Sequence, residues 1–215
     1  MMPTRERSVC PMGQDVPAVP GGTAYWSDIE RRLAPYFERA EPRQQALAYL
    51  RGLLSTAERK NSWQLAESSG AATPYAFQHL WRRARWHPEA VRAERHRYVV
   101  QHLGDSEAVL VIDETGFLKQ GRPSAGVARQ YSGTAGRIEN CQMGVFWAYA
   151  SRLGPVLLDQ DLYGPQEWMN DRERCRRAGM PEDRHFATKP QLARQMLARA
   201  LAAGVPAQWV TGARV

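Results

Sequence analysis

The chain has 215 residues, of which 43% are hydrophobic and 24% are charged, so it can bury one sizeable core or two small ones, which excludes a wholly disordered protein. Its 29 Lys and Arg outnumber 22 Asp and Glu, which gives a formal net charge of +7. Because the forked guanidinium of Arg matches phosphate, nucleic acid is the first partner to consider. A genome-wide bias in composition is the alternative explanation of the Arg content.

The cysteines and the apolar runs indicate the compartment. Cys10, Cys141 and Cys175 are an odd number at unrelated spacings, which predicts neither a disulfide framework nor a zinc site and fits reduced thiols. The first residues lack the apolar region of a signal peptide, and no run is long enough to span a membrane. The sequence therefore predicts a cytoplasmic protein with no membrane partner.

The first hundred residues have helical patterns. Residues 1–22 carry several prolines and a Gly-Gly pair, which predicts a flexible leader. Apolar periodicity predicts a helix from near residue 26 and a second from residue 43 to residue 54, with a break at Glu41 and Pro42. Three further helices are expected, over residues 62–67, 74–86 and 88–103.

A short helix, a turn with a glycine and a second helix form the outline of a helix-turn-helix, so residues 23–104 are expected to be a helical DNA-binding domain. Between Thr73 and Val100 there are six Arg and two Glu. Helical spacing places apolar side chains such as Phe77 and Leu80 on one face and polar ones on the other. The candidate DNA contacts are Gln78, Arg82, Arg83 and Arg85. A solvated basic face on an ordinary helical bundle is the alternative.

A short apolar run precedes a carboxylate in the second half of the chain. The run from Val109 to Ile112 is typical of a central strand buried on both faces, and it is expected to stop at Asp113 and open into a polar loop. Chemistry in open α/β sheets collects at the carboxyl ends of such strands, so Asp113 is a candidate site residue. The alternative is that Asp113 caps a turn.

The remaining patterns predict an α+β or α/β domain with a mixed sheet over residues 105–215. Strands are expected over residues 141–150 and 155–163, joined by a hairpin, followed by a polar helical stretch, a helix over 190–203 and a strand over 208–211. Asp159 and Asp161, two apart on a strand, are expected to face outward.

Basic side chains follow Asp113 in a stretch that contains many glycines. Lys119, Arg122 and Arg129 lie there without an intervening acidic residue. A flexible basic loop beside a carboxylate suits a phosphate backbone that crosses the site, so these three residues are further candidate DNA contacts. The alternative is an exposed β-structured loop that binds no ligand.

Three phrases carry a resemblance to a known family: Val-Leu-Val-Ile-Asp113-Glu-Thr-Gly-Phe-Leu-Lys-Gln-Gly, Gly126-Val-Ala-Arg-Gln-Tyr-Ser-Gly133 and Phe186-Ala-Thr-Lys-Pro190. Their order resembles an insertion-sequence transposase of the DDE superfamily, a DNA endonuclease with a ribonuclease-H-like core. The resemblance implies binding of terminal inverted repeats, then DNA strand cleavage and transfer during transposition, a form of DNA recombination. It also implies two Mg²⁺ or Mn²⁺ ions held by three carboxylates.

The chain departs from that family pattern near its last residue. Asp113 matches the first carboxylate, but Ala213 stands where the second Asp would follow the fourth core strand, and no later Glu is present. We therefore expect a truncated copy, a catalytically inactive fragment in which the metal ions are not functionally bound. The alternative is a non-enzymatic DNA-binding inhibitor that occupies element ends. A second copy of the chain or an intact transposase is the expected protein partner.

Overall fold

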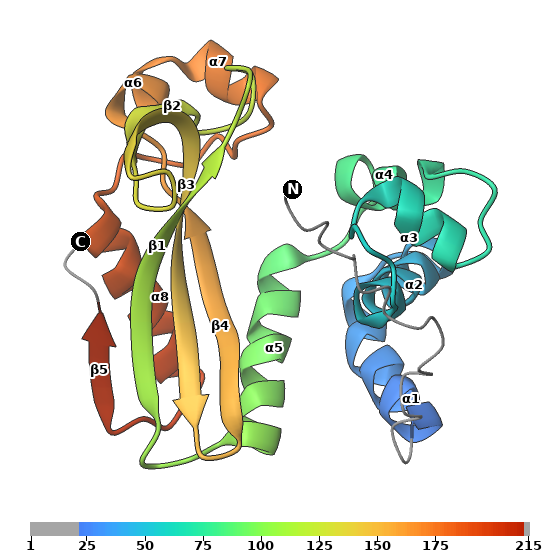
Figure 1. Ribbon diagram of the computed structural model, residues 1–215. Coiled ribbons are helices and arrows are strands. Elements are labelled where there is room, and N and C mark those ends of the chain that lie inside the picture. Colours follow the sequence, from blue (N-terminus) through green and yellow to red (C-terminus); the bar gives the residue numbers. More distant parts are fainter. Residues whose placement is uncertain (1–21, 213–215) are drawn as a thin grey trace, which may run out of the picture. The chain divides into compact units, whose positions relative to one another are not determined.

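The computed structural model describes residues 22–212, which divide into two compact units between Val91 and Arg92 (Figure 1). The first unit contains α1 (Gly22–Leu33), the 3₁₀ helix η1 (Ala34–Tyr36), α2 (Ala40–Leu54), α3 (Ser62–Ser68), α4 (Tyr75–Arg82) and the start of α5 (Pro88–Leu103). The second contains most of α5, then β1 (Val109–Leu118), β2 (Ala128–Ser132), β3 (Arg137–Ser151), β4 (Gly154–Leu162), α6 (Gln166–Asn170), α7 (Arg172–Arg177), α8 (Lys189–Ala202) and β5 (Trp209–Gly212). The predicted leader lies outside the described residues except for Gly22, which begins α1.

The predicted break at Glu41 and Pro42 is wrong, because α2 begins at Ala40 and includes both residues. Pro is tolerated in the first turn of a helix, where its missing N–H would have had no partner inside the helix. Glu41 in the same turn interacts favourably with the positive end of the helix dipole. The two residues therefore start the helix instead of ending the previous one.

The helix α4 is shorter than predicted, since it ends at Arg82 and not near residue 86. Trp86 forms an isolated β-bridge with Phe37, and its indole N–H donates to the carbonyl of Leu80 at 3.3 Å. These contacts draw the chain after Arg83 out of the helix. Arg85 consequently lies beyond the helix and not on its face as predicted. The apolar side of α4 is buried as expected, with Phe77 in a small core with Leu65 and Ala66 of α3.

The second unit is built on a mixed five-stranded sheet (Figure 1). β3 pairs antiparallel with β1 along one edge, and with β2 and then β4 along the other. β5 pairs parallel with the outer edge of β1. The predicted hairpin is confirmed, since Ser151 pairs with Gly154 at the turn between β3 and β4. This mixture of helices and mixed sheet is consistent with the nuclease-like fold that the resemblance implies.

Side chains alternate between the two faces of this sheet. On one, which we call the covered face, Leu110, Trp147 and Tyr149 are buried in the main core with Met196 of α8. The indole N–H of Trp147 donates to the carbonyl of Ala193 in α8 at 3.1 Å. The other, which we call the open face, carries more exposed side chains: Asp113, Phe117, Leu157 and Trp209.

The helix α5 belongs largely to the sheet unit. Its residue Val99 is part of the main core, and Arg92 and Arg95 reach Asp159 of β4. The boundary between the units therefore falls before Arg92, earlier than the boundary expected at Gly104. Within the described residues, no helix combines the length and the apolar character that a membrane crossing requires.

Candidate functional site

Asp113 lies where the parallel partner of β1 stops. β1 pairs with β5 from Val109 to Ile112, and the last pair is Ile112 with Gly212. The prediction that the strand itself ends at Asp113 is wrong, because pairing with the long strand β3 carries β1 on to Leu118. A side chain at Gly212 would collide with Ile112, so glycine lets the two strands approach closely just before Asp113. Asp113 is thus at the carboxyl end of the parallel pair, the position at which sites form in such sheets.

The carboxylate of Asp113 is exposed on the open face. Its Oδ1 accepts a hydrogen bond from the backbone N–H of Glu114 at 2.7 Å. The residue paired with Asp113 on β3 is Phe146, whose ring makes an edge contact with Phe117 at 6.1 Å between centroids. An anionic group therefore stands next to apolar rings on an accessible surface.

Glu114 points the opposite way. Its carboxylate forms an ion pair with Lys189 at the start of α8, and the Lys189 ammonium also lies 5.7 Å from the centre of the Tyr163 ring. Adjacent residues of a strand face opposite sides of the sheet. Asp113 and Glu114 are neighbours in sequence but cannot hold the same ion.

The expectation that Asp159 and Asp161 face outward is wrong. Their partners on β3 are Trp147 and Val145, so both point to the covered face, and Asp159 is 0% exposed. Asp159 is surrounded by Arg92 and Arg95 of α5 and Arg199 of α8. Because they lie on the other side of the sheet from Asp113, neither is a second ligand beside it.

The described residues do not fit the two-metal centre that the resemblance implies. Between residues 22 and 212, no group of three or more His, Cys, Asp or Glu side chains gathers in a geometry that could hold a metal ion. Asp113 is the sequence-predicted carboxylate on the open face, and Ala213 lies outside the described residues. We therefore assign no catalytic step to a metal in this chain.

The basic residues that follow Asp113 in sequence are spread out in the structure. Lys119 comes directly after β1, where its N–H donates to the carbonyl of Asn140 at 2.9 Å, and Arg122 is exposed in the next loop. Arg129 pairs with Asn140, which puts it on the open face. Asn140 is about 20 Å along β3 from the residue opposite Asp113, at roughly 3.3 Å per residue. Arg129 thus shares a face with Asp113 without being next to it.

The predicted DNA contacts of the helical unit do come together. Gln78, Arg82 and Arg83 line a hollow of about 360 Å³ together with Tyr75 and His79. A second hollow, of about 350 Å³, lies between α4 and the start of α2 and is lined by Glu38, Arg39, Pro42, His79, Arg83, Ala84 and Arg85. We call the two together the basic groove, since they share His79 and Arg83.

Sequence reasoning missed Arg39, Tyr75 and His79 in this groove. Arg39 is distant in sequence from α4, and only the folding of α2 against α4 brings it there. Tyr75 and His79 share the polar face of α4 with Gln78 and Arg82 by helical spacing. That spacing was visible in the sequence and could have identified both residues.

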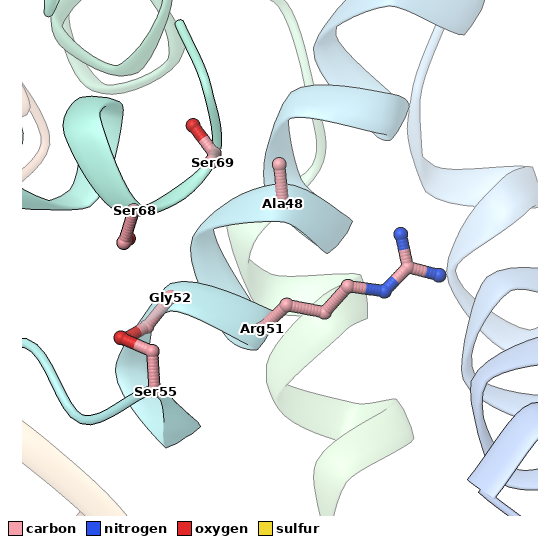
Figure 2. A pocket seen from close by; sticks show the side chains of 6 residues that line it. All are labelled: Ala48, Arg51, Gly52, Ser55, Ser68 and Ser69. Carbon is pink, nitrogen blue, oxygen red and sulfur yellow. The ribbon is translucent and has the colours of Figure 1, made fainter. Parts of the chain in front are cut away.

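A third hollow lies between α2 and the end of α3 and differs in chemistry (Figure 2). It has a volume of about 270 Å³, and three serines line it. Each serine hydroxyl already donates to a backbone carbonyl: Ser55 to Gly52, Ser68 to Leu65 and Ser69 to Ala66. The guanidinium of Arg51 extends away from these serines (Figure 2) and lies 4.8 Å from the centre of the Trp26 ring. The ammonium of Lys60 donates to the carbonyls of Gly52 and Ser55, so the cations at this hollow are already engaged.

Comparison with known proteins places the chain in a family. Residues 32–212 match the family described as DDE superfamily endonuclease. The chain is also 28% identical over 152 residues to a probable transposase for insertion sequence element IS701 from Microchaete diplosiphon, a match that covers 69% of this chain and 37% of that relative. No solved structure matches the chain significantly. Because the family match spans most of the sequence, including the whole of the sheet, the chain belongs to the DDE superfamily endonucleases.

Proposed function

We propose that this chain binds the terminal inverted repeats of an insertion sequence through its basic groove, as a transposase does, and does not itself cut DNA. The observation that carries the proposal is the state of the arginines in the groove. Arg82, Arg83 and Arg85 are exposed, and none of them has an ion-pair partner within residues 22–212. Clustered guanidiniums repel one another, so a polyanion is the partner that stabilises them.

The polar face of α4 supplies the two kinds of contact that DNA recognition needs. Gln78 presents an amide that can pair with an adenine edge, whereas arginines hold phosphates or guanine. In the sheet unit, Lys119, Arg122 and Arg129 add positive charge in the stretch after Asp113. These residues support a second, weaker contact with the DNA backbone.

Fluorescence anisotropy with duplex DNA of the cognate element end would test the binding. The Arg82→Ala, Arg85→Ala double variant should bind more weakly. The negative slope of log affinity against log salt should become less steep by about two, because about one counterion fewer is released for each phosphate contact that is lost. Arg31→Ala is the control, since Arg31 is already paired with Asp28. An unchanged slope in the double variant would contradict DNA binding by the groove.

We propose that the chain does not cut DNA because of the residue types that it carries at the family's carboxylate positions. Members of the DDE endonuclease family generally use divalent metal ions, and Ala213 offers no carboxylate at the position where the family pattern has its second Asp. Incubation of end DNA with Mg²⁺ or Mn²⁺ should therefore give no nicked product. Nicking that disappears in the Asp113→Ala variant would show that this part of the proposal is wrong.

A second candidate function is inhibition of an intact transposase. It is favoured by the combination of a basic groove with Ala213 in place of a carboxylate. Co-expression should then reduce excision of the element by an intact transposase, and the Arg82→Ala, Arg85→Ala variant should lose this effect. Equal excision with and without the wild-type chain would rule inhibition out while leaving DNA binding intact.

A further inference from the structure

We infer that the hollow between α2 and α4 is a seat for one backbone phosphate of DNA. Arg39 contacts this phosphate, whereas the side chains that face bases belong to α4. This inference rests on the proposed DNA binding. The seat is lined by Arg39 and Pro42 at the start of α2, and by His79, Arg83 and Arg85 at the end of α4 and just after it. Its volume of about 350 Å³ leaves room for a phosphate diester with bridging waters.

The positive charge of the seat favours the binding of an anion. Three arginines line the seat, Arg39, Arg83 and Arg85, against one acidic residue, Glu38. Arg39 is exposed and, within the described residues, has no ion-pair partner. Other arginines of the same unit are engaged: Arg31 and Arg32 both pair with Asp28. The seat therefore brings together three cations that have no ion-pair partner within the described residues.

The backbone at the seat adds to this charge. Arg39 is the residue that precedes α2, and its side chain makes no capping hydrogen bond to the first turn. The first N–H groups of a helix have no partner inside it, and this end of a helix attracts anions. Ala40 and Glu41 retain such N–H groups, whereas Pro42 has none. A phosphate in the seat would meet these donors as well as the guanidiniums.

The hollow of Figure 2 shows that not every hollow of this unit has the chemistry of the seat. That hollow lies at the end of α2 instead of its beginning, and its serine hydroxyls already donate hydrogen bonds to backbone carbonyls. The cations at that hollow are engaged, since Arg51 is held over Trp26 and Lys60 donates to the carbonyls of Gly52 and Ser55. Opposite ends of one helix thus carry a hollow with unpaired cations and a hollow whose cations are engaged, which supplies a matched control.

Arg39→Gln tests the seat by anisotropy binding to duplexes of the cognate end and of scrambled sequence. We expect roughly tenfold weaker binding to both duplexes and a salt slope reduced by about one, because a phosphate contact carries no sequence information. Glu38→Gln should bind both duplexes a few-fold more tightly, since it removes the opposing carboxylate. Arg51→Gln should bind as the wild type does. Thermal unfolding of each variant checks that the fold is retained, which is expected because Arg39 and Glu38 are exposed.

The outcomes separate the seat from the proposed function. If the wild type binds DNA but Arg39→Gln binds like the wild type with an unchanged salt slope, the seat is wrong and DNA binding stands. If Arg39→Gln weakens only the cognate duplex, Arg39 reads bases and the phosphate assignment is wrong. If the wild type binds neither duplex, both inferences fail together.

Discussion

The carboxylate of Asp159 lies 3.0 Å from the guanidinium of Arg199, and this ion pair connects β4 to α8 on the covered face of the sheet. Arg92 and Arg95 of α5 approach the same carboxylate at 3.4 Å each. Asp159 is 0% exposed, while the three arginine side chains are between 23% and 33% exposed. One buried carboxylate therefore joins three elements that are far apart in the sequence.

Removal of this carboxylate should destabilise the sheet unit strongly. Asp159→Ala leaves three guanidiniums close together without their shared counter-ion, and the loss of one partner of a buried pair costs roughly 3 kcal/mol or more. Glu173→Ala is the control, because Glu173 and Arg176 form an exposed pair that contributes less than about 1 kcal/mol. Urea unfolding of the two variants measures the difference. Equal midpoints would mean that the Asp159 cluster contributes no more than a surface pair.

His96 makes stability depend on pH near neutrality. Its Nε2 is 4.0 Å from Asp159, yet its pKa is lowered from the ordinary 6.5, chiefly by burial and with Asp159 opposing the change. The folded chain therefore binds this proton less readily than the unfolded chain, so stability should fall as pH falls through 6.5. His96→Gln should flatten this part of the profile. NMR titration of the His96 ring provides the direct measurement, and a midpoint above 6.5 would contradict the prediction.

Asp105 controls a second pH range. Hydrogen bonds from the backbone N–H groups of Arg152 and Glu107, and then from the Arg152 side chain, lower the pKa of Asp105 to about 2. A depressed acid pKa stabilises the fold above its unfolded value near 3.8, and this contribution is lost as pH falls towards 2. Asp105→Asn should therefore lower the melting temperature at pH 6 and have progressively less effect between pH 4 and pH 2. Glu107→Gln, at an exposed position, serves as the control.

Arg174 should hold the loop between β1 and β2 in place. Its guanidinium lies 3.8 Å from the centre of the Trp168 ring and donates to the carbonyls of Val127 and Arg122 at 3.4 and 3.5 Å. Arg174→Ala removes these contacts, so amide hydrogen exchange over residues 119–127 should become faster. Arg176→Ala, which loses a pair only with Glu173 of the same helix, should leave that segment unchanged. Similar exchange in both variants would show that the loop does not depend on Arg174.

Local signals in the sequence predicted the elements that local chemistry determines. The hairpin at Ser151 to Gly154, the helix α8 and the strand β5 were all predicted within a few residues. Two of the misses depend on distant partners. β1 extends past Asp113 because β3 is long enough to pair with it, and α4 stops early because Trp86 bridges to Phe37.

The same distinction applies to the candidate site. An apolar run that ends in a carboxylate was enough to single out Asp113. The ion pair of Glu114 and the burial of Asp159 involve cations from α8 and α5, which no local pattern connects to them. The polar face of α4 was predicted from helical spacing. Arg39 lies in the basic groove only because α2 packs against α4, which no local pattern shows.

The placement of Asp113 and Glu114 on opposite faces makes the length of β1 as important as its composition. A substitution along this strand changes one side chain at a time. The insertion or deletion of a single residue between Val109 and Asp113 would exchange the two faces together, so that Asp113 turned towards α8 and Glu114 pointed outward. Changes of strand length in this segment should therefore be tolerated far less well than conservative apolar replacements.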